Sequence, residues 1–388
     1  MSGRKVCILM SMGAPPLHPR VYQKECRTLV KAGYEVVIIA PHERDENRDG
    51  IQIRSLPVYG SRLVRLLVTP WLVFAKAMRE KAAVYQIENI ELIPPALLLR
   101  FLGKRVVYDV LEDTPDQVPF MFWVPPLIRK PLAWMVKKLE HFGARRFSAV
   151  IAAGVEIGER LGACNKQTAI VHNYPLLEEF VDSIALEPAR RTSKKIICLG
   201  GISSDRAGRE IVKAMGLLPR DLEAKLIFAG HLASPAYLDE VVRTPGWERV
   251  EYRGIISREE VKTLMAEAAA ALVLYSPAPN HLDIRSLRFY ESLAAGLPVV
   301  TSNFPKWRAM VEGEGFGLIV DPTNPESIAE AIQYLLTHPE EAAAMGRRGR
   351  QAVRERYNWG VEEAKLLQVY RESLDGNPSR SPRLASTK

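Results

Sequence analysis

The chain has 388 residues, of which 47% are hydrophobic and 25% charged, and its 53 basic and 45 acidic side chains give a net charge of +8. This length exceeds what a single hydrophobic core usually serves, so two domains are expected, and the composition excludes a wholly disordered chain. The positive balance favours an anionic partner, which could be a nucleotide, a phosphate, an acidic lipid surface or a nucleic acid.

Membrane-spanning, secreted and zinc-binding classes are disfavoured by the sequence. No apolar run reaches the roughly 18 uncharged residues of a membrane span, and Met1 leads into the strand-like run Lys5–Met10 without a signal-peptide pattern, so we expect a cytoplasmic protein. The cysteines form no Cys-x-x-Cys pair, which argues against a zinc site or a disulfide framework and predicts buried thiols. They are Cys7, Cys26, Cys164 and Cys198.

In the first half of the chain, short β-rich runs alternate with amphipathic stretches. Strands that are apolar at every position have no wet side, so this pattern predicts a parallel sheet covered by helices on both faces. We therefore interpret residues 1–185 as a Rossmann-like domain. The predicted strands are Val6–Met10, Glu35–Ala40, Ile51–Leu56, Ala83–Ile87, Arg105–Val110, Ala149–Ala152 and Thr168–Val171.

The second half repeats the alternation after a polar stretch, which predicts a linker at residues 186–194 and a second Rossmann-like domain at 195–357. An amphipathic helix is predicted at 358–375 and a disordered tail at 376–388. We expect an α/β fold in which two doubly wound domains face a central cleft with their strand carboxyl ends, where such sheets place ligands. The predicted strands are Lys195–Gly200, Lys225–Ala229, Val250–Arg253, Ala271–Tyr275, Pro298–Thr301 and Gly317–Val320.

The segment Asn280–Val300 contains a predicted helix from about Arg285 to Ala295. Arg288 and Glu291 are three residues apart and share one helix face, while Asp283 precedes the helix. A cation for a diphosphate, carboxylates for sugar hydroxyls and the free N–H groups of a helix start together suit a nucleotide sugar. On spacing alone, an ordinary ion pair with Asp283 as helix cap is equally favoured.

A second candidate segment, Cys198–Glu210, is a strand that ends in Gly200 and Gly201 and turns into a helix carrying Arg206. Glycines allow backbone amides to approach a phosphate closely, and an arginine can bind two phosphate oxygens. A tight turn with a solvated arginine is the equally weighted alternative for this segment taken alone.

An ordered set of segments carries a resemblance. They are Gly200–Arg206, Ala229–His231, Tyr252–Gly254, Ala278–Leu282 and Arg288–Pro298, preceded by His18–Arg20, Lys24–Val37 and Tyr108–Asp113. In these segments the chain resembles the retaining glycosyltransferases of the B-type fold known as group 1. The resemblance covers most of the chain and implies transfer of a sugar from a nucleotide-diphosphate donor to a saccharide or lipid-linked acceptor.

The resemblance also implies roles for individual positions. Arg206 and Arg288 match the basic pair on the diphosphate, and Asp283 and Glu291 match the acid pattern that binds sugar and ribose. The further donor contacts that we predict are Gly200, Gly201, Gly230, His231, Arg253, Gly254, Arg285, Ser286 and Leu287. The predicted acceptor contacts are His18, Arg20, Asp109, Glu112 and Asp113.

Four positions depart from the family pattern. Asp283 stands where glutamate is usual and is one methylene shorter, and Arg288 replaces a lysine, which changes a point donor into a fork. Ala207 stands where glycine is common, and Leu111 where relatives often have a histidine. The departures at Asp283 and Leu111 keep open a non-enzymatic relative that binds nucleotide sugars or partner proteins. A second alternative is a nucleotide-sugar epimerase of the same fold, which would share the diphosphate site.

The sequence offers no nucleophile and base with hydrolase spacing, so we expect catalysis by electrostatic stabilisation of the departing diphosphate. Neither a metal nor a cofactor beyond the nucleotide sugar is expected. Asp109, Glu112 and Asp113 suggest a metal cluster less strongly than they suggest acceptor binding or helix capping.

Aromatic residues alternate with cations in Phe120–Arg146 and, more weakly, in Arg62–Lys81. Such segments suit an anionic membrane surface and would make the protein peripheral on the inner face of a membrane, in polysaccharide or glycolipid synthesis. Helices that cover the sheet and keep their basic faces in solvent are the equally favoured alternative. Nucleic acid is not expected as a partner, because no known binding module is visible.

Overall fold

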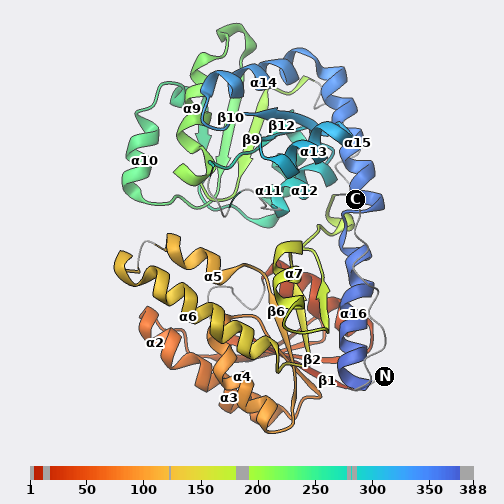
Figure 1. Ribbon diagram of the computed structural model, residues 1–388. Coiled ribbons are helices and arrows are strands. Elements are labelled where there is room, and N and C mark those ends of the chain that lie inside the picture. Colours follow the sequence, from red (N-terminus) through yellow and green to blue (C-terminus); the bar gives the residue numbers. More distant parts are fainter. Residues whose placement is uncertain are drawn as a thin grey trace. The chain divides into compact units, whose positions relative to one another are not determined.

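The computed structural model describes residues 4–11, 18–121, 124–180, 192–277, 281 and 286–375. The chain divides into two compact units (Figure 1). Unit 1 combines Met1–Asn173 with Trp359–Lys388, and unit 2 is Tyr174–Asn358. Cys7, Cys26 and Cys198 are buried free thiols, as predicted, whereas the free thiol of Cys164 is partly exposed and not buried as expected.

Unit 1 is built on one mainly parallel sheet. Its strands are β1 (Lys5–Leu9), β2 (Glu35–Pro41), β3 (Glu46–Arg48), β4 (Ile51–Leu56), β5 (Val84–Ile87), β6 (Arg105–Val110), β7 (Ala149–Ala152) and β8 (Thr168–Ile170). Its helices and helical turns are η1 (Pro19–Cys26, wound as a π-helix), α1 (Arg27–Lys31), α2 (Arg62–Leu67), α3 (Thr69–Glu80), η2 (Ile90–Leu92), α4 (Ile93–Phe101), α5 (Thr114–Gln117), η3 (Val118–Phe120), α6 (Pro126–Ala144), α7 (Val155–Gly162) and α16 (Trp359–Asp375).

The strand order of this sheet is β3-β4-β2-β1-β5-β6-β7-β8, so the chain reverses direction across the sheet between β1 and β5. The seven strands expected from apolar runs are all present, and they pair in parallel as predicted. The antiparallel edge strand β3 was not predicted, because its sequence Glu-Asn-Arg is entirely polar.

Helices cover both faces of the sheet. Side chains of α3, α4 and α7 share one core with β1, β5 and β6. On the other face, α16 runs along β5 to β8 and contacts α1 and η1 (Figure 1). The indole Nε1 of Trp359 donates to Thr28 Oγ1 at 3.0 Å, and the hydroxyl of Tyr370 donates to Gln86 in the buried interior. The helix expected at 358–375 is therefore part of unit 1 rather than an appendage of the second domain.

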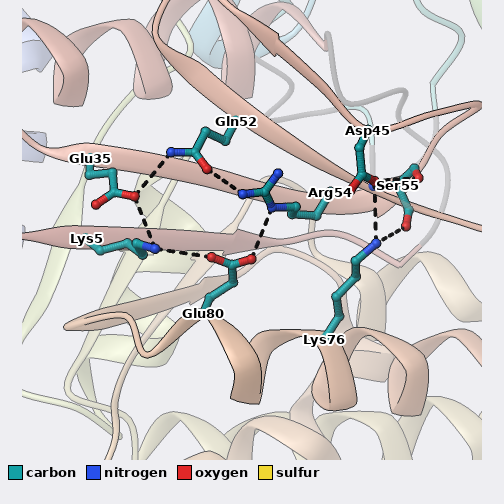
Figure 2. Close-up of polar contacts among 8 residues, drawn as sticks. All are labelled: Lys5, Glu35, Asp45, Gln52, Arg54, Ser55, Lys76 and Glu80. Atoms are coloured by element: carbon teal, nitrogen blue, oxygen red, sulfur yellow. Dashed lines mark hydrogen bonds and ion pairs between the residues drawn. The ribbon is translucent and has the colours of Figure 1, made fainter.

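A polar network fastens α3 to β1 and β4 (Figure 2). The Nζ of Lys5, at the beginning of β1, lies 3.3 Å from one carboxylate oxygen of Glu80, the last residue of α3. Arg54 of β4 holds the other oxygen of Glu80 at 3.2 Å. One turn earlier, Lys76 donates to the carbonyl oxygen of Ser55 at 2.6 Å. These contacts fix one side of α3 against the sheet and leave its other side exposed.

Unit 2 has a fully parallel sheet among its described residues. Its strands are β9 (Lys195–Leu199), β10 (Lys225–Ala229), β11 (Val250–Tyr252), β12 (Ala270–Val273), β13 (Val299–Ser302) and β14 (Gly317–Val320). Its helices and helical turns are η4 (Leu177–Phe180), η6 (Ser204–Arg206), α9 (Gly208–Leu217), η7 (Arg220–Leu222), α10 (Pro235–Val242), η8 (Trp247–Arg249), α11 (Arg258–Glu267), α12 (Leu287–Ala294), α13 (Pro305–Glu314), α14 (Pro325–Thr337) and α15 (Pro339–Glu355).

The strand order is β11-β10-β9-β12-β13-β14, which contains every strand predicted for the second half. Helices α9 and α14 pack on one face of the sheet, and α11, α12 and α13 pack on the other. Tyr174 and Phe180 lie in the second of these cores. The first unit therefore ends at Asn173 and not at residue 185, because the chain already packs into unit 2 from Tyr174 onward.

Residues 186–191 of the expected linker and the expected tail 376–388 lie outside the described residues. Within the part of the chain that the structure describes, no helix combines the length and the apolar character needed to cross a membrane.

Candidate active site

The reversal of strand order in unit 2 lies between β9 and β12. In an open parallel sheet, the loops that leave two such strands diverge to opposite faces, and the gap between them at the carboxyl ends is the usual ligand position. The loop after β9 carries Gly200, Gly201 and Arg206, and the loop after β12 leads into α12. Both segments singled out from the sequence thus begin at the same edge of the sheet.

Gly200 and Gly201 form the turn after β9. A Cβ atom on Gly200, whose φ is +115°, would stand 3.1 Å from Nη1 of Arg206, and one on Gly201 would stand 3.8 Å from its Nε. The guanidinium of Arg206 therefore lies directly beside the two glycines. A phosphate at this turn could meet backbone amides and a forked cation together.

Gly230, at the end of β10, closes against this turn. Its φ is +151°, and a Cβ at this position would lie 1.6 Å from the carbonyl oxygen of Gly200, which no side chain can tolerate. The N–H of Gly230 donates to the carbonyl of Gly254 at 2.7 Å, so the loops after β9, β10 and β11 are joined by their backbones. The glycines of the predicted donor site are needed for this close approach.

The loop after β12 holds the loop of Arg206 in place. The amide of Ser276 donates to the carbonyl of Asp205 at 2.9 Å, and its hydroxyl donates to that of Ser204 at 2.6 Å. The guanidinium of Arg206 stands 5.0 Å from the ring centroid of Tyr275. Arg206 is thus oriented by two loops before any ligand binds, as electrostatic catalysis requires.

Ala207, the residue after this arginine, adopts φ +52°, a left-handed conformation that costs an alanine roughly 1 kcal/mol. The structure thus explains why glycine suits this position, and Ala207 has no exposed surface. The departure affects the backbone of the turn rather than the charge of the site.

Helix α12 places Arg288 and Glu291 on one face, as the spacing predicted. The side chain of Glu291 is only 2% exposed, and its Oε2 accepts from Nη1 of Arg288 at 2.7 Å. Its other oxygen lies 2.7 Å from Nη2 of Arg258, the first residue of α11. The ion pair that spacing alone allowed is therefore formed, but it is buried on the carboxylate side and includes a second arginine that sequence reasoning missed.

Other predicted donor residues are placed as follows. Ser286 is buried as the residue before α12, and Leu287 is its first residue, so the helix starts two residues later than predicted. His231 and Arg253 are exposed beyond β10 and β11, and Arg253 pairs with Glu251 at 2.6 Å. Asp283 and Arg285 lie outside the described residues.

In unit 1, Arg20 and Asp109 are enclosed completely. Nη2 of Arg20 lies 3.1 Å from Oδ1 of Asp109, its Nε lies 2.8 Å from Glu25, and its Nη1 donates to the carbonyl of Val171 at 3.0 Å. The side chains of Arg20, Glu25 and Asp109 have no exposed surface. Arg20 and Asp109, predicted as acceptor contacts, are thus occupied in an internal ion network.

This network gathers carboxylates around one cation. Oxygen atoms of Glu25, Glu88 and Asp109 lie within 4.8 Å of one another, a grouping that could serve a metal ion. The guanidinium of Arg20 already neutralises two of them. Burial, followed by the charge of Asp109, raises the pKa of both Glu25 and Glu88 well above the usual range. The chemistry of the group is that of a partly protonated carboxyl cluster on an arginine.

The remaining predicted acceptor residues lie nearer the surface. Asp113 caps α5, accepting from the amide of Asp116, and pairs with Arg160 at 3.0 Å. Glu112 is exposed and accepts from Gln117 at 3.0 Å. Burial, with the charges of Lys24 and Arg20, lowers the pKa of His18, which is therefore neutral at physiological pH. Helix capping, the alternative given for the acidic group, holds for Asp113.

Sequence reasoning missed a group of polar side chains at the strand reversal of unit 1. Ser11, just after β1, is buried and donates from its amide to Asn89 Oδ1 at 2.9 Å and from its hydroxyl to Glu91 at 2.6 Å. Because β1 and β5 flank the reversal, these side chains mark the ligand position of this sheet. The strand order, had it been derived from the sequence, would have indicated them.

Comparison with known families gives a clear match. The family model described as "Glycosyl transferases group 1" matches residues 184–352, and the model described as "Glycosyl transferase 4-like domain" matches residues 19–173. Together they cover most of both units. The predicted resemblance to the group 1 glycosyltransferases is confirmed.

Curated relatives of this chain match over part of their length. It is 27% identical over 183 residues to a GDP-mannose-dependent alpha-(1-6)-phosphatidylinositol monomannoside mannosyltransferase of Mycobacterium tuberculosis, covering 45% of this chain and 47% of that protein. It is 29% identical over 196 residues to a D-inositol 3-phosphate glycosyltransferase of Thermobispora bispora, covering 50% and 38%. The chain thus spans about half the length, or less, of the curated relatives it matches.

Solved structures show the same fold over nearly the whole chain. Sucrose-phosphate synthase from Thermosynechococcus elongatus superposes with a TM-score of 0.76 at 19% identity, covering 96% of this chain and 100% of that chain. The Anabaena protein HepE in complex with UDP-glucose superposes with a TM-score of 0.71 at 13% identity, covering 95% and 99%. The predicted B-type glycosyltransferase fold is confirmed.

Proposed function

We propose that this chain moves a sugar, with retention of anomeric configuration, from a nucleotide-diphosphate sugar to a saccharide or lipid-linked acceptor, without a metal ion. The observation that carries the proposal is the turn at Gly200 and Gly201, with Arg206 held beside it at the strand reversal of unit 2. Backbone amides, a fixed guanidinium and glycines without side chains are the elements that bind a diphosphate.

In the proposed reaction, the bond between the anomeric carbon and the diphosphate oxygen breaks while a bond to an acceptor hydroxyl oxygen forms, and the hydroxyl proton is released. Negative charge accumulates on the departing diphosphate. Arg206 stabilises that charge because two loops orient it in advance, and Arg288 supplies a second guanidinium that is 32% exposed. These two cations would do the work that a divalent ion does elsewhere.

Acceptor-dependent turnover tests the reaction. With UDP- and GDP-sugars as donors, we expect release of the nucleoside diphosphate to rise when saccharide or lipid-extract acceptors are added, and to continue in the presence of a chelator. An epimerase would convert the donor with no acceptor present, and a binding protein would leave it unchanged. Activity that is abolished by EDTA and restored by magnesium would contradict metal independence.

The proposed lipid-linked acceptor would require contact with a membrane, for which unit 1 offers a surface. Helix α2 buries none of its residues, and Leu63 and Leu67 are 69% and 68% exposed. On α6, Leu127 is 93% exposed and Trp134 is 65% exposed, with the Nζ of Lys138 5.6 Å from its ring centroid. Trp134 is thus not packed against the sheet, whereas Trp123 lies outside the described residues.

The charge around these side chains determines which kind of surface fits them. Exposed cations accompany the apolar residues of α6 and its carboxyl end, namely Lys130, Lys137, Lys138, Arg145 and Arg146. Exposed apolar side chains next to several cations suit the headgroup region of an anionic bilayer. We therefore assign this face, α2 with α6, to an anionic lipid surface.

Vesicle sedimentation tests that assignment. Because each cation near an anionic surface contributes about 1 kcal/mol, replacing Lys137 and Lys138 by Glu should weaken binding at least roughly 30-fold. Binding of the wild type should fall steeply with added salt, and neutral vesicles should retain little protein. The double variant Arg243→Glu with Arg354→Glu, in unit 2, changes the net charge equally and should bind like the wild type. Equal pelleting of both double variants would refute the assignment.

A further inference from the structure

Arg258 joins two carboxylates that come from separate segments of unit 2. Its Nη2 lies 2.7 Å from Glu291 on α12 and 2.6 Å from Glu179 on η4, and its Nε donates to the second oxygen of Glu179 at 3.2 Å. The guanidinium also stands 5.6 Å from the ring centroid of Phe180. Burial disfavours the charged guanidinium, but Glu179 and Glu291 outweigh this cost and raise the pKa of Arg258.

Glu291 needs such a partner because it is almost fully enclosed. A carboxylate that is 2% exposed loses most of its hydration, which favours the neutral acid unless cations compensate. In the structure, two guanidiniums provide that compensation, one for each oxygen. The remaining nearby cation of the described core, Arg350 of α15, donates to the carbonyls of Ala294 and Ala295 at the far end of α12 and not to Glu291.

The two arginines differ in what else they do. Arg288 is the residue assigned to the donor diphosphate, and a guanidinium turned toward a diphosphate is drawn away from Glu291. Arg258 is held by Glu179 with two further contacts and carries no assigned role toward the donor. When a donor occupies the site, Arg258 would be the cation that stays with Glu291.

We infer that Arg258 is a positioning residue, which keeps the carboxylate of Glu291 aimed at the donor's ribose or sugar hydroxyls while Arg288 engages the diphosphate. This inference rests on the proposed function for its ligand. Its structural part, a guanidinium that fixes the position of the Glu291 carboxylate, stands on the contacts within unit 2 alone.

Binding of UDP and GDP by calorimetry tests the positioning role in Arg258→Met and Arg258→Lys. In the Met variant we expect the affinity for the nucleotide to fall roughly 10- to 100-fold, because one charge-assisted hydrogen bond is lost. The Lys variant keeps a cation and should restore part of the affinity. Arg308→Met, an exposed arginine paired with Glu312 on α13, should bind like the wild type.

A donor-independent measurement separates the two proposals. With carbon-13 labelled glutamate and no nucleotide, the resonance that disappears in Glu291→Gln should move in Arg258→Met and stay close to its wild-type position in Arg258→Lys. Melting curves identify a variant that fails to fold, in which case the Lys variant carries the test. A wild type that binds neither nucleotide overturns the proposed function only, whereas an unmoved Glu291 resonance in Arg258→Met overturns the inference about Arg258.

Discussion

Replacing Glu291 by Gln is expected to lower the affinity for the nucleoside diphosphate of the donor by roughly 100-fold, because it removes a charged acceptor from a site with two guanidiniums. Glu291 is held by Arg258 and Arg288 at 2.7 Å each, so its orientation is fixed before the donor arrives. A neutral amide has the same shape, but it can accept from one of these arginines only and presents N–H groups to the other.

Glu291→Ala should also destabilise the fold, contrary to what the spacing of a surface pair suggests. Breaking a buried ion pair costs about 3–5 kcal/mol, and we expect roughly 2 kcal/mol here, since Arg258 keeps Glu179 and both arginines are about one-third exposed. Urea unfolding and calorimetry measure the two effects. The matched variant Glu312→Gln, on the exposed pair with Arg308, should alter neither. Unchanged nucleotide affinity in Glu291→Gln would refute the role assigned to Glu291.

Replacing Arg20 by Met is expected to cause the largest loss of stability, about 3–5 kcal/mol near neutral pH, because it leaves buried carboxylates without their cation. The guanidinium contacts Glu25 and Asp109, all three side chains being fully buried, and Glu88 lies within the same cluster. Methionine fills most of the volume, so the loss reports charge rather than a cavity. Urea unfolding measures it. The exposed pair of Arg27 with Asp49 supplies the control Arg27→Met, for which we expect less than about 1 kcal/mol.

The same cluster predicts how stability changes with pH. Burial raises the pKa of Glu25 and Glu88 above the ordinary value of 4.5, so the folded state binds more protons than the unfolded state between these values. This contribution to the free energy of unfolding is complete below about pH 4.5 and is lost as pH rises through the folded pKa. Arg20→Met should therefore be more destabilised at about pH 8 than at about pH 5. An equal loss at both pH values would contradict the assigned charge states.

The sequence predicted the strands well because most of them are short runs of mainly apolar residues that are buried in their sheets. It did not predict β3, whose three polar residues carry no periodic signal. The position of α16 was also missed, since an apolar stripe indicates that a helix packs but not on which sheet; buried contacts of Trp359 and Tyr370 decide that.

The residues of the candidate site likewise fall into those that the sequence predicted and those that it did not. Motif spacing identified Arg206, Arg288 and Glu291, since neighbouring residues in one loop or helix determine their relative positions. It could not identify Arg258, because the contact with Glu291 depends on how α11 packs beside α12. Spacing also could not show that Arg20 and Asp109 face the interior. Their burial depends on the ion pair between them, which joins η1 to β6.

Calorimetric titration with UDP and GDP, in EDTA, tests the central claim that Arg206 and the turn at Gly200 bind the donor's diphosphate. We predict that the wild type binds at least one of the two nucleotides without added metal. Arg206→Met should bind it roughly 100-fold more weakly, as expected for loss of a charged hydrogen-bond donor to phosphate. Arg209→Met, an exposed arginine on α9 paired with Glu240, should bind like the wild type. Equal affinity of Arg206→Met and wild type, or binding by the wild type only after a divalent metal is added, would contradict the account.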